Sequence, residues 1–125
     1  MEGYKAVVER ASKELSVKEK IMLKDMSDAV KLDDVVKENA LIISPDYYAI
    51  VAVHNEKSDT KDYKKIVLVD KDGTKYTTGS MPFITTFEDI VDEMADAGED
   101  DYAIKIYPKE SKNYKGKYFI TCSII

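Results

Sequence analysis

Lysines and tyrosines are gathered in two short stretches of this 125-residue chain, residues 57–65 and residues 105–117. Such residues together can hold a nucleic-acid strand, because ammonium groups contact phosphates and flat rings stack on bases. Two strand tyrosines outside these stretches extend the same chemistry. The predicted nucleic-acid-binding residues are Tyr47, Lys57, Tyr63, Lys64, Tyr76, Lys105, Tyr107, Lys109, Lys112, Tyr114, Lys115 and Lys117.

The residue types that most often carry catalysis are scarce. The chain has one histidine, His54, and one cysteine, Cys122. A nucleophilic Cys–His pair would need the two side chains to meet, but Cys122 alternates with Ile120 and Ile124 and is expected to be buried in a strand. A structural thiol and a strand-end histidine are the favoured interpretation.

Metal and nucleotide motifs are also missing from the sequence. A zinc site needs more thiolate or imidazole ligands than one cysteine and one histidine provide. The string DKDG at residues 70–73 is typical of a hairpin turn and lacks the other ligands of a calcium loop. No glycine-rich phosphate loop is followed by Lys-Ser or Lys-Thr. We therefore expect no enzyme activity, no cofactor and no metal.

The sign of the charge changes sharply late in the chain. Eight acids and no base lie between Glu88 and Asp101, whereas five lysines and one acid lie between Lys105 and Lys117. The net charge of −5 alone would disfavour a polyanionic partner, but this segregation leaves room for one basic surface. As an alternative function, the acidic run would let a small protein bind and inhibit a host protein by mimicking nucleic acid. A solvated helix face is the favoured interpretation of those acids.

Composition is typical of one soluble globular domain. Hydrophobic residues make up 44% and charged residues 34% of the chain, which is long enough to bury a core. A single cysteine excludes an intrachain disulfide and fits a reducing compartment. Because residues 1–10 show no apolar signal core and no apolar run is long enough to span a bilayer, we expect a cytoplasmic protein without a membrane partner.

Hydrophobic periodicity predicts a helix over residues 3–15, whereas residues 16–40 fit both strand and helix. Asp72-Gly73 indicates a hairpin turn. Helical spacing begins at Phe83, with Thr85 and Glu88 as a capping box and Gly98 as the stop. Alternating, β-branched or aromatic stretches predict five strands, over residues 47–54, 65–70, 74–78, 102–107 and 117–125.

Three strands, one helix and two strands is the element order of the OB-fold. We therefore predict a mainly β protein with a five-stranded Greek-key barrel over residues 41–125 and its helix between strands three and four. Residues 1–40 would form a helical extension packed on or next to the barrel. Since the loops between strands one and two and between strands four and five flank the ligand face of an OB-fold, we expect the two lysine–tyrosine stretches to share one face.

Five short strings in the chain resemble a known family. They are VHNEKS (Val53 to Ser58), YTTGS (Tyr76 to Ser80), PFITTFEDI (Pro82 to Ile90), SKNYKGK (Ser111 to Lys117) and FITCSI (Phe119 to Ile124). Together they look like the single-stranded DNA-binding proteins of phages and mobile elements of Gram-positive hosts, over residues 20–125.

The resemblance implies a non-catalytic protein that coats single-stranded DNA, with little sequence preference, during replication or recombination. It implies the host cytoplasm as the location. Replication or recombination proteins are candidate partners for the acidic helix, and a homo-oligomer is left open.

Overall fold

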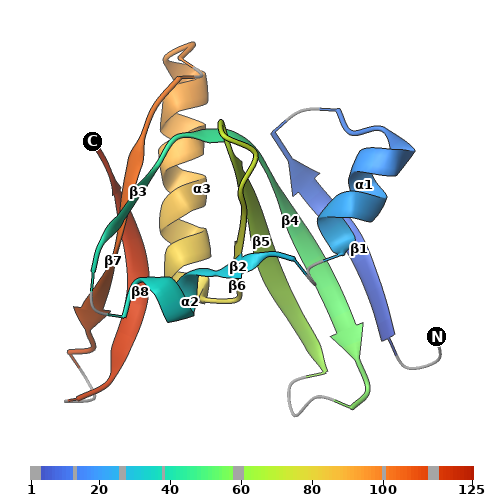
Figure 1. Ribbon diagram of the computed structural model, residues 1–125, viewed down its shortest axis with the longest axis horizontal. Helices are drawn as coiled ribbons and strands as arrows, with labels where there is room; N and C mark the ends of the chain where they lie inside the picture. Colours follow the sequence, from blue (N-terminus) through green and yellow to red (C-terminus); the bar gives the residue numbers. More distant parts are fainter. Residues whose placement is uncertain are drawn as a thin grey trace. The chain divides into compact units, whose positions relative to one another are not determined.

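The computed structural model describes residues 4–12, 14–25, 28–37, 39–57, 61–99, 101–112 and 116–125. Strands predominate, so the predicted mainly β class is confirmed (Figure 1). In chain order the elements are β1 (Tyr4–Ala11), α1 (Val17–Lys24), β2 (Val30–Lys31), α2 (Leu32–Val35), β3 (Leu41–Ile43), β4 (Pro45–Asn55), β5 (Asp62–Asp70), β6 (Lys75–Thr78), α3 (Met81–Asp96), β7 (Ile104–Glu110) and β8 (Tyr118–Ile124).

The chain forms two compact units, each made of two separate segments. The first contains Met1–Val30 and Asp46–Gly79, and the second Lys31–Pro45 and Ser80–Ile125. The first is built around a five-stranded sheet of order β1-β4-β5-β6-β2, and the second around a three-stranded sheet of order β3-β7-β8. Both sheets are open in the part of the chain described. The predicted domains, residues 1–40 and 41–125, are each one continuous segment of the chain. This division stays a prediction.

The helix predicted over residues 3–15 is wrong, because residues 4–11 form strand β1. This strand pairs with β4 in antiparallel fashion, with Lys5 opposite His54 and Val7 opposite Ala52. Its register shifts between Val8 and Arg10, and such a bulge breaks the alternation that would mark a strand. Non-local pairing with β4 thus decides the structure of a segment whose local pattern is ambiguous.

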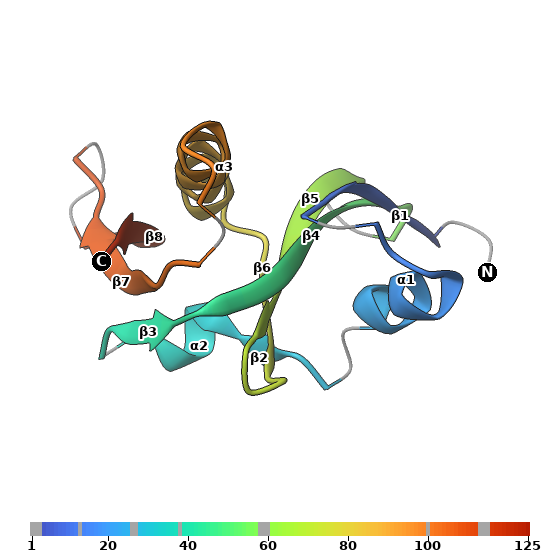
Figure 2. The ribbon, with the colours of Figure 1, turned by 90° about the horizontal axis from the view of Figure 1, so that it is seen from above.

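Helix α1 lies on one face of the five-stranded sheet (Figures 1 and 2). Ser16 begins it with a capping box: the Glu19 amide donates to Ser16 Oγ and the Ser16 amide to Glu19 Oε1, both at 3.1 Å. The helix resolves part of the ambiguous stretch 16–40. Buried residues beneath it form the core of this unit: Leu15, Leu23, Ala49, Val51, Val53, Val67 and Val69.

Lys75 of β6 fastens the end of α1 to the sheet. Its ammonium donates to the carbonyl oxygens of Met22 at 2.8 Å and Asp25 at 2.9 Å, and contacts the Asp28 carboxylate at 3.0 Å. Only 14% of the Lys75 side chain is exposed. A lysine at this point satisfies the last carbonyls of a helix and its negative dipole end.

Strands β4, β5 and β6 confirm the three strands predicted over residues 47–78. The turn between β5 and β6 is the predicted one, and Gly73 takes a φ of +91° that glycine adopts without a steric penalty. The Thr74 amide donates to Asp72 Oδ1 at 2.9 Å, and this bond lowers the pKa of the Asp72 carboxyl. The hairpin is therefore specified by its own turn residues.

Helix α3 packs along β8 in the second unit, and β7 and β8 confirm the two last predicted strands. Phe83, Ile84 and Phe87 are fully buried, with the two phenyl rings stacked at a centroid distance of 6.0 Å. The predicted start at Thr85 is wrong: Ser80 is the N-cap, its Oγ accepting from the Phe83 amide at 3.5 Å. Pro82 in the first turn pre-sets the helical backbone one turn earlier than the Thr85–Glu88 pattern suggests. Gly98, at a φ of +73°, follows the helix end as predicted.

In the described part of the chain, every helix is too short or too polar to cross a bilayer.

Candidate nucleic-acid interface

One face of the three-stranded sheet carries cations and aromatic rings side by side. Antiparallel pairing sets Lys105 opposite Ser123, Tyr107 opposite Thr121 and Lys109 opposite Phe119. Side chains two positions apart in a strand share a face, so Lys105, Tyr107, Lys109 and Phe119 lie on one face, which we call the lysine face. The intervening residues, Ile104, Ile106, Ile120 and Cys122, are buried on the opposite face.

The side chains of the lysine face are open to solvent to different degrees. Lys105 and Lys109 are exposed, while Tyr107 and Phe119 are half-buried. The Tyr107 hydroxyl is hydrogen-bonded to Ser123 Oγ at 2.8 Å, which ties the phenol to the neighbouring strand. Ile42 of β3, paired with Lys105, extends the same face and is 62% exposed. The arrangement offers two separated cations and two rings held by a rigid sheet.

The hairpin between β7 and β8 adds further cations at one end of this sheet. Lys112 and Lys117 are exposed, and the hairpin is closed by a bond of 2.8 Å from the Ser111 amide to the Lys117 carbonyl. Tyr114 and Lys115, also predicted as site residues, lie outside the described residues. The second lysine–tyrosine stretch thus supplies most of one continuous surface on a single hairpin.

The predicted residues of the first lysine–tyrosine stretch, and Tyr47 outside it, have different surroundings. Tyr47 and Tyr63 are half-buried and pack against the core beneath α1. The Lys64 ammonium pairs with the Glu9 carboxylate at 2.8 Å, so its charge is partly neutralised. Lys57 is exposed beyond the end of β4. Of these four residues, Lys57 is the one most readily offered to a phosphate.

Tyr76 is also poorly placed for contact with a polyanion. Burial raises the pKa of its phenol, and the nearby carboxylates of Asp70 and Asp72 raise it further. A phosphate approaching this ring would meet two negative charges. The structure therefore gives Tyr76 an environment that disfavours the predicted role.

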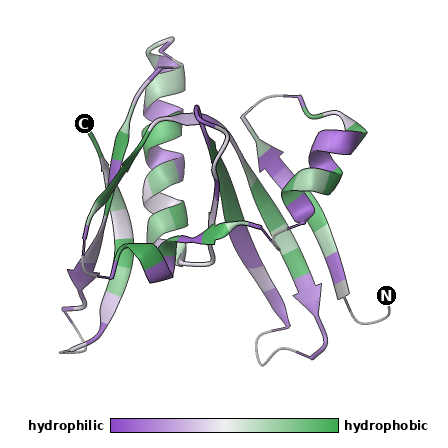
Figure 3. Ribbon diagram, in the orientation of Figure 1, coloured by the Kyte–Doolittle hydropathy of each residue, from purple (hydrophilic) through white to green (hydrophobic). Residues whose placement is uncertain are grey.

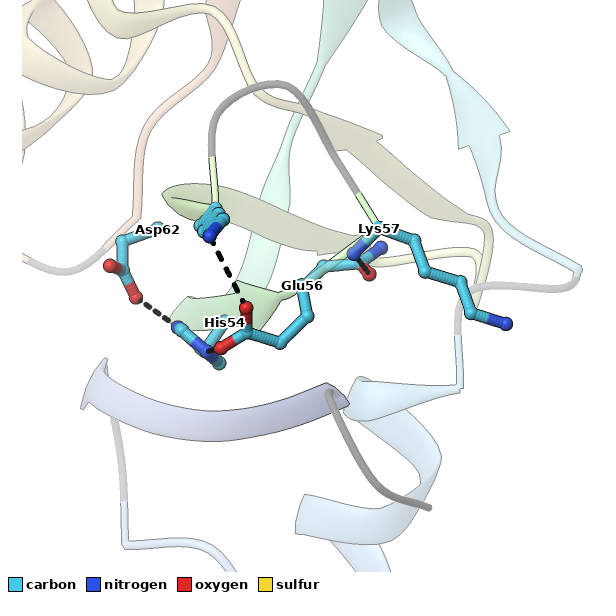
Figure 4. A network of polar contacts seen from close by, with 6 residues as sticks. His54, Glu56, Lys57 and Asp62 are labelled. Carbon is cyan, nitrogen blue, oxygen red and sulfur yellow. Dashed lines mark hydrogen bonds and ion pairs between the residues drawn. The ribbon is translucent and has the colours of Figure 1, made fainter.

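His54 lies at the centre of a polar cluster at the loop between β4 and β5 (Figure 4). Its Nδ1 is 2.6 Å from Asp62 Oδ1 and its Nε2 is 2.6 Å from Glu56 Oε1. These bonds raise the pKa of His54, because only the doubly protonated ring can donate to both carboxylates. Lys61 contacts Glu56 at 3.5 Å, whereas the Lys57 side chain extends away from the cluster. Strands β4 and β5 turn from hydrophobic to hydrophilic toward this loop (Figure 3).

Cys122 has the environment of a structural thiol. It is buried, and burial raises the pKa of the thiol to about 12, so that the reactive thiolate is scarce at neutral pH. Among the described residues, no group of three or more His, Cys, Asp or Glu side chains is arranged to hold a metal ion.

The two lysine–tyrosine stretches belong to different units. Their predicted convergence on one face stays a prediction. Sequence reasoning missed Phe119, although the alternation of FITCSI would have placed it on the face opposite Cys122. It also left out Tyr118, which is 66% exposed at the start of β8.

The lysine face and its hairpin have the residue types of a surface that binds a single nucleic-acid strand. Residues 20–125 match the model of the phage single-stranded DNA-binding protein family, so the chain belongs to that family. This confirms the resemblance seen in the five short strings. Searches of curated proteins and of solved structures returned no match.

Proposed function

We propose that this protein binds single-stranded DNA through the lysine face and the β7–β8 hairpin, without catalysing a reaction. The observation that carries the proposal is the register of β7 and β8, which sets Lys105, Tyr107, Lys109 and Phe119 on one face. Membership of the phage single-stranded DNA-binding protein family supports the choice of ligand. The biological role would be the coating of exposed strands during replication or recombination in the host cytoplasm.

The chemistry of this surface favours tolerance of DNA sequence. Lysine contacts a phosphate as a point charge, and every base offers a ring face for stacking, so neither contact reads a base edge. Counterions released from the strand would supply much of the binding free energy. We therefore expect little discrimination between oligonucleotides of different sequence.

The course of the chain supports an OB-fold for this function. Strands β3 and β4 are separated by Ser44 alone, yet β3 pairs with β7 and β4 with β5. A first strand that changes partners along its length, followed by two strands, a helix and two strands, is the pattern expected of a Greek-key barrel whose corner is one bent strand. We propose that β3 and β4 together act as strand one, with β5, β6, β7 and β8 as the others.

The test is the anisotropy of a fluorescent oligo-dT titrated with protein at several salt concentrations. Affinity should fall steeply with salt, by a log–log slope of about 0.7 for each phosphate contacted. The double variant Lys105→Ala/Lys109→Ala should reduce that slope by about 1.4, whereas Lys18→Ala/Lys20→Ala on α1 is the matched control and should leave it unchanged.

Stacking is tested in the same assay with Tyr107→Ala and Phe119→Ala. Each should weaken binding by about 5- to 150-fold if its ring stacks on a base, and Tyr107→Phe should retain most of the affinity. Salt-independent binding of the wild-type protein, or unchanged affinity in all the lysine-face variants, would remove this face from the site.

A further inference from the structure

A second surface of the same unit lies around the β7–β8 hairpin and shares Phe119 with the lysine face. A cavity of about 610 Å³ is lined by residues of α2 and its C-terminal end, the N-cap of α3 and both hairpin strands. Its size is within the range of small-molecule sites, which is ample for one nucleoside. The lining residues are Asp33, Val36, Lys37, Ser80, Pro108, Tyr118, Phe119 and Ile120.

Much of the lining of this cavity is apolar. Val36 is fully buried and Ile120 is 6% exposed, so these two side chains form a closed floor. Pro108 stands opposite Ile120 in the register of β7 and β8. Tyr118 leaves 66% of its surface open to solvent. An apolar floor with an exposed aromatic wall suits a planar heterocycle that has lost its stacking neighbours.

The charges at the cavity determine which part of a nucleotide enters. Lys37 and Asp33, both exposed, bring an ammonium and a carboxylate to the lining. A phosphate would be repelled by the Asp33 carboxylate and would lose its hydration over the apolar floor, whereas a neutral base meets neither cost. Lys37 can hold the phosphate at the edge of the cavity while the base lies inside.

The cavity also lies next to the cations that would hold the rest of the strand. Lys117, which is exposed, precedes Tyr118 at the hairpin end of β8. Lys109 lies on the lysine face, across the sheet from Pro108 and Tyr118. A strand that leaves the lysine face over the hairpin end, past Lys117, therefore reaches the mouth of the cavity. We propose that the cavity receives one unstacked base of the bound single strand, with Tyr118 as its stacking partner and Lys37 on the adjacent phosphate. This inference rests on the proposed function and deepens it.

The variants that test it are Tyr118→Ala, Tyr118→Phe and Lys37→Ala in the oligo-dT titration. Tyr118→Ala should weaken binding about 5- to 150-fold, while Tyr118→Phe should stay within about two-fold of the wild type, because the ring and not the hydroxyl stacks. Lys37→Ala should lower the salt slope by about 0.7. Ile124→Ala, an exposed apolar change at the other end of β8, is the matched control and should bind as the wild type does.

A direct readout is photocrosslinking of an oligonucleotide that contains 5-iodo-deoxyuridine, followed by peptide mapping. We expect a crosslink within the β8 segment at Tyr118 or Phe119, and loss of the Tyr118 crosslink in Tyr118→Ala. If the wild-type protein binds oligo-dT but Tyr118→Ala binds equally well and no crosslink maps to Tyr118, the base-binding cavity is ruled out while the proposed function stands. If the wild-type protein does not bind oligo-dT, the proposed function itself fails.

Discussion

His54 is held between two carboxylates at the end of β4, and each of its ring nitrogens has its own partner. In the neutral ring one nitrogen carries no proton, so one of the two short contacts would place a lone pair against a carboxylate. The folded state therefore favours the imidazolium, and the pKa of His54 is raised above its ordinary value of 6.5. This makes the hairpin loop a place where stability depends on pH.

The sign of that dependence follows from the raised pKa. Stabilisation by the charged ring is fully present below the unfolded-state value of 6.5 and is lost as the pH rises through the higher folded-state value. We expect the urea midpoint of the wild type relative to His54→Gln to be highest at about pH 5.5 and to decline above pH 6.5.

The control for this prediction is Asp62→Asn, which removes the partner that contributes most to the raised pKa. It should flatten the difference between pH 5.5 and pH 8.5. A constant difference between wild type and His54→Gln across this range would show that His54 acts by packing alone.

At the scale of elements, α1 is attached to its sheet by apolar contacts and by one lysine. The short helix buries Leu23, and at its end the Lys75 ammonium donates to the carbonyl oxygens of Met22 and Asp25. Hydrogen bonds from a charged donor are each worth about 1.5–3 kcal/mol, and losing the donor leaves the last carbonyls of α1 to be hydrated by water alone. The polar end of Lys75 thus contributes to this contact together with the apolar side chain of Leu23.

We expect Lys75→Met, which keeps the length of the side chain, to lower the free energy of unfolding by about 1–3 kcal/mol. Chemical denaturation followed by circular dichroism measures this change. Lys71→Met, at the exposed turn between β5 and β6, is the matched control and should change stability by less than about 0.5 kcal/mol. Equal stability of the Lys75 and Lys71 variants would contradict the role of Lys75.

Local signals predicted the elements whose ends are marked by their own residues. Asp72-Gly73 sets the β5–β6 turn and Gly98 ends α3, so these positions could be predicted from the sequence. The strand β1 could not, because its pairing partner is β4 and its alternation is broken by a bulge. The same limit applied to Tyr47 and Tyr63: their side of the sheet is covered by α1, and no spacing within β4 or β5 reveals which side that is.

At the scale of the whole chain, the segregated charges are found within one unit. The acids Asp89, Glu93 and Asp96 are exposed on α3, and the lysine face belongs to the sheet of that same unit. Like charges on α3 and the DNA repel over roughly the Debye length, about 10 Å at 0.1 M salt. The acids should therefore restrain DNA binding at low salt and confine the strand to the lysine-bearing surface.

Replacing these residues in Asp89→Asn/Glu93→Gln/Asp96→Asn should raise oligo-dT affinity a few-fold at 50 mM salt and have little effect at 0.5 M, as long-range electrostatics requires. Long-range repulsion acts mainly on the association rate, so stopped-flow mixing with oligo-dT measures this change. Unchanged association rates would show that these carboxylates do not act on the approaching strand. Loss of a host-protein complex with DNA binding intact would favour the alternative function, in which the acidic helix binds a host protein.

The buried thiol of Cys122 has a practical consequence for these experiments. Cys122 is the sole cysteine of the chain, and its thiol is almost entirely un-ionised. Alkylating probes should therefore not react with it while the protein is folded. A cysteine placed at the exposed Lys18 position on α1 can then carry a single dye without prior removal of the native thiol. The natural sequence already serves as a background for labelling at one chosen site.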